Sequence, residues 1–248
     1  MQISIITATY NSSKTINDCI VSVYNQTWPN IEHIIIDGAS TDNTIKIIKS
    51  VSNRVTTIKS EHDNGIYDAM NKGINLATGD IIGILNSDDL YSDNLVLEKI
   101  ANIFSSTDVD CVHADLYYVN KENTDNIVRY WKTCDFIPGA FKKGWHPAHP
   151  TFFVRKEVYQ KYGLFNLDFS LAADFELMLR LLERYKVTSI YFPQPIVRMR
   201  LGGATSKNIR NIIIQNLECY KAFKVNGLRV SIIYPLYRLL PKLKQFFK

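Results

Sequence analysis

Short apolar runs alternate with amphipathic helical patterns through the first half of the chain. Buried strands are predicted at residues 3–6, 34–36, 55–58 and 81–85, and apolar side chains recur at helical spacing between them, as at residues 16–24. Continuous apolar strands separated by such helices are typical of a mostly parallel sheet that is covered on both faces. The sequence therefore predicts an α/β fold with a central sheet flanked by helices.

The second half is less regular. A strand is predicted at residues 109–113, a hairpin from 116–119 and 127–131, and two late strands at 190–192 and 196–199 around Pro193 and Pro195. Apolar residues at helical spacing predict helices near 177–182 and 208–223. We expect one domain over residues 1–206, with halves at about 1–110 and 111–206, and a helical C-terminal extension over 207–248.

Composition narrows the class of protein. Hydrophobic residues make up 46% of the 248 and charged residues 21%, as in an ordinary globular protein. The formal net charge of +5 is too small to indicate nucleic-acid binding. The 4 cysteines form no CxxC pair, so the sequence does not indicate a zinc site or a disulfide framework. A cytosolic protein with reduced cysteines is the simpler interpretation. No signal peptide is recognisable and no apolar run reaches the roughly 18 residues of a spanning helix, so we expect a cytoplasmic protein.

Polar and acidic residues follow the predicted strands. In open α/β sheets, ligands bind in the crevice beyond the carboxyl ends of the strands, so these residues are candidates for one common site. They are Thr7, Thr9, Tyr10 and Asn11 at the first strand, Asp37, Gly38 and Ser40 at the second, Asp63 at the third, and Asn86, Ser87, Asp88 and Asp89 at the fourth. The chain has no GxGxxG or GxxxxGK[ST] loop, so a nucleotide would be held by side chains and a metal ion.

Asp88 and Asp89 are the candidate metal ligands. Mg²⁺ prefers one or two carboxylates together with phosphate oxygens and waters, and a bound Mg²⁺ or Mn²⁺ stabilises the charge on a departing diphosphate. The alternative is that Ser87, Asp88 and Asp89 only turn the chain and cap the next helix. Asp37 also has two interpretations, as an acceptor for a base N–H or a ribose hydroxyl, or as part of an Asp-Gly-Ala-Ser turn.

A series of motifs occurs in a fixed order along the chain. They are Thr9-Tyr10-Asn11, DGASTD at 37–42, EHDNGIYDAMNKG at 61–73, ATGD at 77–80 and LNSDD at 85–89. Together they resemble the family-2 glycosyltransferases of the GT-A fold, a Rossmann-like α/β fold, as found in bacterial polysaccharide and O-antigen gene clusters. The likeness spans roughly residues 3–205.

The resemblance implies a role for each matched position. The half at 1–110 would bind a UDP-sugar, with the strand end at 7–11 and Asp37 beside the uracil and ribose. Asn86, Ser87 and Asp88 would occupy the D-x-D motif, with Mn²⁺ or Mg²⁺ near Asp88 and Asp89, although many members have Asp where this chain has Asn86. The wall beside the nucleotide and sugar would be formed by Asp63, Tyr67, Asp68, Asn71 and Lys72.

The second half would bind the acceptor, and the matched position of Asp174 implies a general base there. Such a base takes the proton from the acceptor hydroxyl and must lie within hydrogen-bond reach of it. Asp174 would also stabilise the first turn of its helix, and both roles are compatible. Glu176 is the second choice for the base, or a solvated helix residue.

Two further features have open interpretations. His146 and His149 would approach the metal or the acceptor, or belong to a structural loop, and their spacing excludes an HExxH zinc helix. Arg198, Arg200, Gly202 and Gly203 suggest a loop that closes over the diphosphate, or Gly202 and Gly203 only break the chain.

The C-terminal extension mixes apolar, aromatic and basic residues from Leu228 to Lys248. Such a segment lies on an anionic membrane surface, packs on the preceding domain or forms a homodimer. Membrane contact would fit the lipid-linked acceptors that are usual for members from polysaccharide clusters, which implies a peripheral location on the inner membrane.

The resemblance as a whole implies an inverting transferase. It would move a hexose or N-acetylhexosamine from a UDP-sugar to a sugar hydroxyl on undecaprenyl diphosphate. One alternative is a non-catalytic sugar-nucleotide-binding partner, against which the presence of Asp88, Asp89 and Asp174 argues. The other is a nucleotidyltransferase, against which the absence of a Gly-rich, basic N-terminal loop argues.

Overall fold

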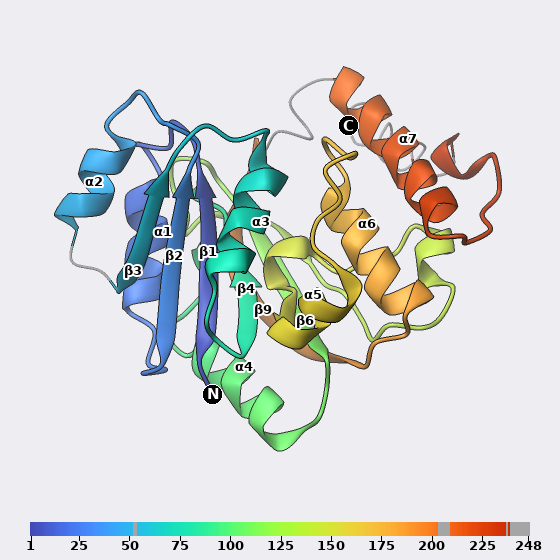
Figure 1. The fold of residues 1–248 in the computed structure, drawn as a ribbon, viewed down its shortest axis with the longest axis horizontal. Helices are drawn as coiled ribbons and strands as arrows, with labels where there is room; N and C mark the ends of the chain where they lie inside the picture. The colour runs from blue at the N-terminus through green and yellow to red at the C-terminus, as the bar shows by residue number, and fades with distance from the viewer. Residues whose placement is uncertain (52–53, 203–208, 237, 239–248) are drawn as a thin grey trace.

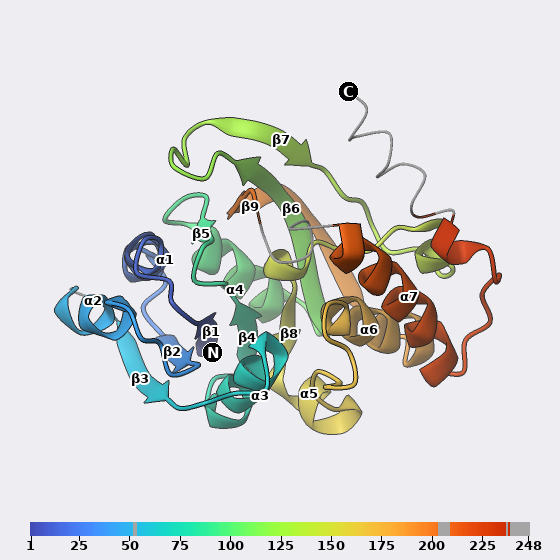
Figure 2. The ribbon, with the colours of Figure 1, turned by 90° about the horizontal axis from the view of Figure 1, so that it is seen from above.

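A computed structural model of the chain describes residues 1–51, 54–202, 209–236 and 238. One mixed sheet of nine strands runs through these residues, in the order β3-β2-β1-β4-β8-β6-β9-β5, with β7 paired to β6. Helices flank the sheet on both faces (Figures 1 and 2).

The strands are β1 Ile3–Thr9, β2 Ile31–Asp37, β3 Val55–Ser60, β4 Ile81–Ile84, β5 Leu90–Tyr91, β6 Cys111–Val119, β7 Ile127–Trp131, β8 Phe153–Arg155 and β9 Ser189–Arg200. The helices are α1 Ile16–Tyr24, α2 Thr44–Ser50, α3 Ile66–Leu76, α4 Val96–Ser106, α5 Lys156–Tyr162, α6 Ala173–Leu179 and α7 Ile209–Val225, with short helical turns η1 Ala140–Lys143, η2 His149–Thr151 and η3 Arg180–Arg184.

The first half is a parallel sheet, as the apolar runs predict. β1 pairs in parallel with β2 and β4, and β2 pairs in parallel with β3. Every residue of β1 and β2 is buried, because helices cover both faces of the sheet at these strands. The carboxyl ends of the parallel strands therefore meet at one edge of the sheet.

The second half adds antiparallel strands. β8 pairs antiparallel with β4 and β6, and β5 pairs antiparallel with β9. The predicted hairpin is confirmed as β6–β7. The division of the chain at about residue 110 stays a prediction, because the one sheet continues across it.

Two pairs of predicted strands are single strands in the structure. Residues 109–113 and 116–119 contribute to one strand, β6, and residues 190–192 and 196–199 to another, β9. The pairing of β6 with β9 shifts register around Asp115, and Pro193 is exposed there. Proline has no backbone N–H to donate, and it is tolerated where the pairing of two strands is irregular. The prolines of β9 therefore interrupt its hydrogen bonds to β6 without ending the strand.

Helix α3 lies unusually close to β1. A Cβ atom added at Gly73 would lie 2.3 Å from Cγ2 of Ile6, so only glycine permits this approach. Ala69, Met70 and Ile74 of the same helix are buried against the sheet, as their helical spacing predicts. The close packing fixes the position of the amino-terminal end of α3, beside the carboxyl ends of the strands.

The predicted C-terminal helix is confirmed as α7, which packs on α6 (Figure 2). Cys219, Ala222 and Phe223 of α7 belong to the same core cluster as Leu177 and Met178 of α6. The predictions made for Gly203 and for residues 239–248 lie outside the described residues. Among the helices that are described, none combines the length and apolar character needed to cross a membrane.

Candidate functional site

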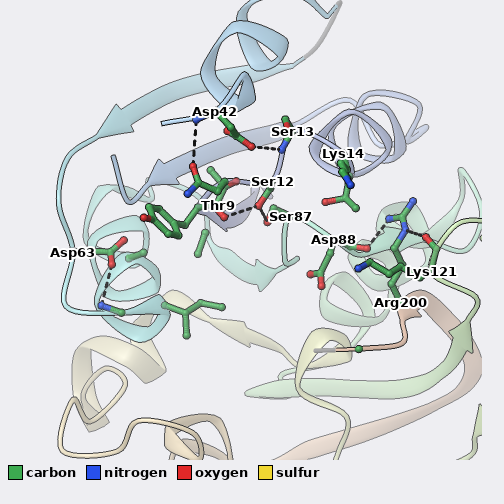
Figure 3. A pocket seen from close by; sticks show the side chains of 18 of the residues that line it. Thr9, Ser12, Ser13, Lys14, Asp42, Asp63, Ser87, Asp88, Lys121 and Arg200 are labelled. Atoms are coloured by element: carbon green, nitrogen blue, oxygen red, sulfur yellow. Dashed lines mark hydrogen bonds between the residues drawn. The ribbon is translucent and has the colours of Figure 1, made fainter. Parts of the chain in front are cut away.

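A pocket of about 610 Å³ opens at the carboxyl ends of β1 and β4. The loop after β1, the loop after β4, the start of α3, the β6–β7 turn and the end of β9 all contribute to it (Figure 3). Of the residues predicted for the site, those that line the pocket are Thr9, Tyr10, Asn11, Asp63, Ser87, Asp88 and Arg200. Positions far apart in the sequence thus meet where the strand ends predict a ligand site.

The end of β1 offers a polar and aromatic wall. The hydroxyl of Thr9 is buried and has no hydrogen-bond partner among the described residues. Tyr10 is 61% exposed, so its ring is free to stack on a planar ligand. Asn11 adopts a φ of 49° and accepts a hydrogen bond of 2.9 Å from the backbone N–H of Thr41. This region is suited to a nucleobase and its sugar.

Several predicted residues lie behind this wall and not on it. Asp37 is fully buried and accepts hydrogen bonds from the N–H of Ser40 at 3.0 Å and from the hydroxyl of Ser60 at 2.6 Å. Thr7 is also fully buried, with its hydroxyl 3.0 Å from Nε2 of His33. Asp37 therefore holds the loop after β2 in place, and its contact with the uracil and ribose stays a prediction.

Gly38 has a steric role at the pocket. A Cβ atom there would lie 2.6 Å from Oδ2 of Asp63, so glycine is needed for Asp63 to approach. Asp63 lines the pocket and accepts a hydrogen bond of 2.9 Å from the N–H of Gly65 at the start of α3. Gly38 thus determines how close this carboxylate lies to the strand ends.

The loop after β4 carries the candidate metal ligands. Ser87 and Asp88 line the pocket, and the Ser87 hydroxyl lies 2.8 Å from that of Ser12. Asp89 is 1% exposed and turns inward, where its Oδ1 accepts a hydrogen bond of 3.2 Å from the N–H of Arg200. Asn86 donates to Oδ2 of Asp89 at 3.3 Å, and its own amide oxygen is buried without a partner among the described residues.

The electrostatics of this loop favour a cation. Burial raises the pKa of Asp88, against the effect of Arg200 and Lys121 nearby. Burial, and next the charge of Asp88, raise the pKa of Asp89 well above its ordinary value. Two adjacent carboxylates in such surroundings are both ionised most readily when a cation offsets their repulsion.

The donor set fits a hard divalent cation that shares its ligands with phosphate. No group of three His, Cys, Asp or Glu side chains suited to a metal occurs within residues 1–51, 54–202, 209–236 and 238. Asp88 in the pocket and the unpartnered oxygen of Asn86 are oxygen ligands, the kind that Mg²⁺ and Mn²⁺ prefer. The remaining ligands would come from the diphosphate and water.

Arg200 joins three parts of the site. Its guanidinium donates to the carbonyl oxygen of Asp88 at 2.6 Å and to that of Lys121 at 3.1 Å, and it forms an ion pair with Asp18 of α1. Arg200 is 5% exposed, so its guanidinium is buried, and these three partners satisfy its hydrogen bonds and its charge (Figure 3). The arginine therefore positions the loop after β4 against the β6–β7 turn.

The residues predicted on α3 separate into two groups. Tyr67 points to the second half of the chain, where its hydroxyl donates a hydrogen bond to Asp174. Asn71 forms two hydrogen bonds of 2.9 Å with the backbone of Phe165. Asp68 and Lys72 form an ion pair of 3.3 Å beside Glu61. Neither group lines the pocket, so these residues hold the surrounding elements together.

The two histidines differ in their surroundings. Burial lowers the pKa of His149, although Asp174 nearby opposes that effect. Its ring packs edge-on against Phe165, at 5.7 Å between centroids. His146 packs edge-on against Trp131 and Phe175 at 5.4 and 5.6 Å. Glu176 is buried and pairs with Arg180 at 3.0 Å, which removes it from the solvent-exposed role considered for it.

Sequence reasoning missed part of the pocket. The further residues that line it are Ala8, Ser12, Ser13, Lys14, Thr15, Asp42, Gly65, Ile66, Ala69, Lys121 and Leu201. Gly202, which was predicted in a loop over the diphosphate, also lines it. Ser12 and Ser13 were within reach of a sequence argument because they follow the motif at 9–11, and Asp42 because it is the last residue of the motif at 37–42. Asp42 accepts a hydrogen bond of 3.1 Å from the N–H of Ser13, and hydrogen bonds from Thr44 lower its pKa to about 2. Lys121 carries no local pattern that marks it.

The mixed sheet, its flanking helices and the acidic loop after β4 define the GT-A fold of glycosyltransferases. Two solved structures share this fold. S. aureus TarS 1-349 in complex with UDP-GlcNAc matches with a TM-score of 0.66 and 17% identity over 88% of this chain and 66% of that one. The mannosyltransferase PcManGT from Pyrobaculum calidifontis, in complex with GDP-Man and Mn2+, matches with a TM-score of 0.67 and 18% identity over 96% and 72%.

The chain belongs to glycosyl transferase family 2, whose model matches residues 4–163. Glycosyltransferase GlyG of Streptococcus pneumoniae is 34% identical over 137 residues, which are 54% of this chain and 45% of GlyG. A PGL/p-HBAD biosynthesis glycosyltransferase of Mycobacterium tuberculosis is 28% identical over 210 residues, which are 83% of this chain and 79% of that protein. The chain thus spans less than half of GlyG and most of the mycobacterial relative.

Proposed function

We propose that the protein transfers a hexose or N-acetylhexosamine from a UDP-sugar to a sugar hydroxyl, with inversion at the anomeric carbon. The observation that carries this proposal is the pocket in which Thr9, Tyr10, Asp63 and Asp88 meet at the strand ends. Two structures with the same fold support a nucleotide-sugar donor, since one contains UDP-GlcNAc and the other GDP-Man with Mn2+.

The donor would lie across the strand ends. The ring of Tyr10 would stack on the uracil, and the free hydroxyl of Thr9 would supply a hydrogen bond beside it. Asp88 would hold Mn²⁺ or Mg²⁺, with the adjacent Asp89 and the amide oxygen of Asn86 as the further candidate ligands. The ion when bound would offset the charge that the diphosphate gains as it leaves. Lys121 and Lys14, which line the same pocket, would add positive charge.

Asp174 would act as the general base. It would take the proton of the acceptor hydroxyl while that oxygen attacks the anomeric carbon from the side opposite the diphosphate. One of its oxygens is held by the hydroxyl of Tyr67, which leaves the other to accept the proton. A single displacement with one base and one leaving group produces inversion.

The acceptor would be a sugar on undecaprenyl diphosphate, in the synthesis of a bacterial surface polysaccharide such as O-antigen. A lipid-linked acceptor calls for a protein on the cytoplasmic side of the inner membrane, in peripheral contact with it. The support is the resemblance to members from polysaccharide gene clusters together with the exposed apolar and basic surface that follows α7.

The first test is the release of nucleotide from a panel of UDP-sugars and GDP-mannose, with Mn²⁺ and with EDTA. The acceptor is a synthetic lipid-diphosphate GlcNAc or GalNAc. We expect acceptor-dependent UDP release from one donor and its loss in EDTA. Asp174→Asn should lower turnover by roughly 10²–10⁴-fold, the contribution typical of a general base. The matched control is Asp168→Asn, an exposed aspartate that precedes α6.

Two other outcomes point to other functions. Mn²⁺-dependent UDP binding without release from any donor, over a widened acceptor panel, indicates a non-catalytic binding partner. Release of pyrophosphate from a nucleoside triphosphate indicates a nucleotidyltransferase. Near-normal turnover in Asp174→Asn shows that the base has been assigned to the wrong residue.

A further inference from the structure

The segment that follows α7 exposes large apolar side chains. Ile232, Ile233 and Leu236 are 80%, 59% and 64% exposed, whereas Tyr234 is 2% exposed. The Tyr234 hydroxyl donates a hydrogen bond of 3.1 Å to the carbonyl oxygen of Phe141. The buried Tyr234 thus anchors the segment, while Ile232, Ile233 and Leu236 on either side of it face outward.

Helical turn η1 presents basic side chains beside this segment. Phe141 is fully buried, while Lys142 and Lys143 directly after it are exposed. These two lysines line a pocket of about 590 Å³, and its other described lining residues are Arg229, Val230, Ser231, Ile233 and Tyr234. The lining therefore combines three basic side chains with apolar ones and includes no acidic residue among those described.

An acidic side chain bound to the start of this turn already has partners. Glu183 accepts hydrogen bonds of 2.8 and 3.0 Å from the N–H of Gly139, which precedes η1. It therefore stabilises the start of the turn without facing the pocket lining. The positive charge of Lys142, Lys143 and Arg229 is left without a carboxylate among the residues that line this pocket.

We infer that the surface formed by Lys142, Lys143 and residues 229–236 docks on an anionic lipid membrane. Apolar side chains inserted among the headgroups and basic side chains attracted to lipid phosphates are the two contributions that hold a peripheral protein on a bilayer. An exposed apolar patch with a basic border marks a contact surface. Charge favours a lipid over a second copy of the chain, because a symmetric dimer would bring like charges together.

The docking surface is connected to the helix that carries Asp174. Phe141 packs edge-on against Phe175, the next residue after Asp174, at 5.4 Å between ring centroids. This contact links the docking surface to α6. The inference deepens the proposed function, on which it rests for the lipid-linked acceptor, because docking would bring Asp174 close to the bilayer in which that acceptor is anchored.

Vesicle co-sedimentation of the full chain tests the inference without donor or acceptor. The probes are phosphatidylcholine vesicles with and without phosphatidylglycerol. We expect binding to the anionic vesicles only, weakened by added salt. The double variant Lys142→Gln/Lys143→Gln should lower the partition coefficient by roughly thirty-fold, as expected for two lysines at an anionic surface. Its control is Lys46→Gln/Lys49→Gln, which makes the same charge change at exposed positions on α2, at the far end of the molecule (Figure 1).

The apolar contribution has its own pair of variants. Ile232→Ser/Ile233→Ser should also weaken vesicle binding, whereas Leu95→Ser, at a position that is 46% exposed, should not. Absence of binding to anionic vesicles overturns the inference, as does equal weakening by the α2 control. A dimer that the patch variants dissociate, with vesicle binding unchanged, would assign the surface to a second copy. A chain that binds vesicles but releases no nucleotide would overturn the proposed function and leave the docking surface in place.

Discussion

The hydroxyl of Tyr67 on α3 donates a hydrogen bond of 3.1 Å to Oδ1 of Asp174 on α6. Burial raises the pKa of Tyr67 well above its ordinary value, so the phenol stays protonated and remains a donor. Its ring stacks on Phe165 at 5.5 Å between centroids, which fixes its direction. This contact joins a residue of the first half of the chain to the proposed base, and we assign Tyr67 the role of positioning Asp174.

Tyr67→Phe removes this hydrogen bond and keeps the ring. A hydrogen bond to a charged group contributes about 1.5–3 kcal/mol, so we expect turnover to fall roughly 10- to 100-fold. The affinity for UDP should stay unchanged, because Tyr67 does not line the pocket. Steady-state kinetics and calorimetric UDP binding measure the two effects separately.

Tyr24→Phe is the matched control for this prediction, since Tyr24 is 43% exposed at the end of α1. An equal fall in turnover and in UDP affinity would mean that Tyr67 supports the fold without positioning the base. Unchanged turnover would rule out both roles for its hydroxyl.

Lys121 is predicted to contact the diphosphate of the donor. Arg200 holds its carbonyl oxygen, and Arg198 binds the same turn through the carbonyl oxygen of Thr124 at 3.3 Å. We expect Lys121→Gln to weaken UDP binding about tenfold and to leave uridine binding unchanged, because only UDP carries the phosphates. The effect should shrink at high salt, since Lys121 is exposed.

Lys132→Gln provides the control for Lys121, because this exposed lysine follows β7 and does not line the pocket. If uridine affinity falls as much as UDP affinity in Lys121→Gln, the lysine acts on the shape of the pocket and not on phosphate. If neither affinity changes, the contact is absent.

Gly73 is predicted to be required for stability. Alanine there would place a methyl group 2.3 Å from Cγ2 of Ile6, in a core with no room for it. Overpacking costs about 1–3 kcal/mol, while alanine gains at most about 1 kcal/mol in helix propensity, so the free energy of unfolding should fall. Urea denaturation measures the change. Asn75 is an exposed neighbour on the same helix, and the control variant Asn75→Ala should not lower the free energy of unfolding. A Gly73→Ala variant as stable as the wild type would show that α3 can move away from β1 at no cost.

The strand ends show which part of the site a sequence can predict. A polar residue after a buried strand must lie at the edge of the sheet, and Thr9, Asp63 and Asp88 do so. The direction of each side chain does not follow from its position, because tertiary hydrogen bonds decide it. Asp37 and Asp89 satisfy the same pattern, yet both turn inward to hold backbone and hydroxyl groups.

The second half shows the corresponding limit for the fold. Pro193 and Pro195 are typical strand terminators in a sequence, but the irregular pairing with β6 accommodates them within β9. The two-residue strand β5 and three-residue strand β8 are too short to produce a pattern, and they form because the sheet offers them partners. Lys121 lines the pocket because Arg200 of β9 holds the turn that carries it. The sequence around Lys121 contains no pattern that predicts this contact.

The buried His33 is predicted to destabilise the protein in acid. Burial lowers its pKa from 6.5 to about 3, so the native state keeps it neutral while the unfolded state binds a proton below pH 6.5. The free energy of unfolding therefore keeps its full value, as far as His33 is concerned, above pH 6.5. It falls as the pH drops from 6.5 toward 3, by at most about 1.4 kcal/mol per pH unit.

His33→Gln removes this titration and keeps a polar partner for the Thr7 hydroxyl, which lies 3.0 Å from Nε2. Urea denaturation at several pH values between about 6.5 and 4 should give the variant a shallower loss of stability than the wild type. Equal slopes for the two proteins would show that His33 is protonated in the native state as readily as in the unfolded chain.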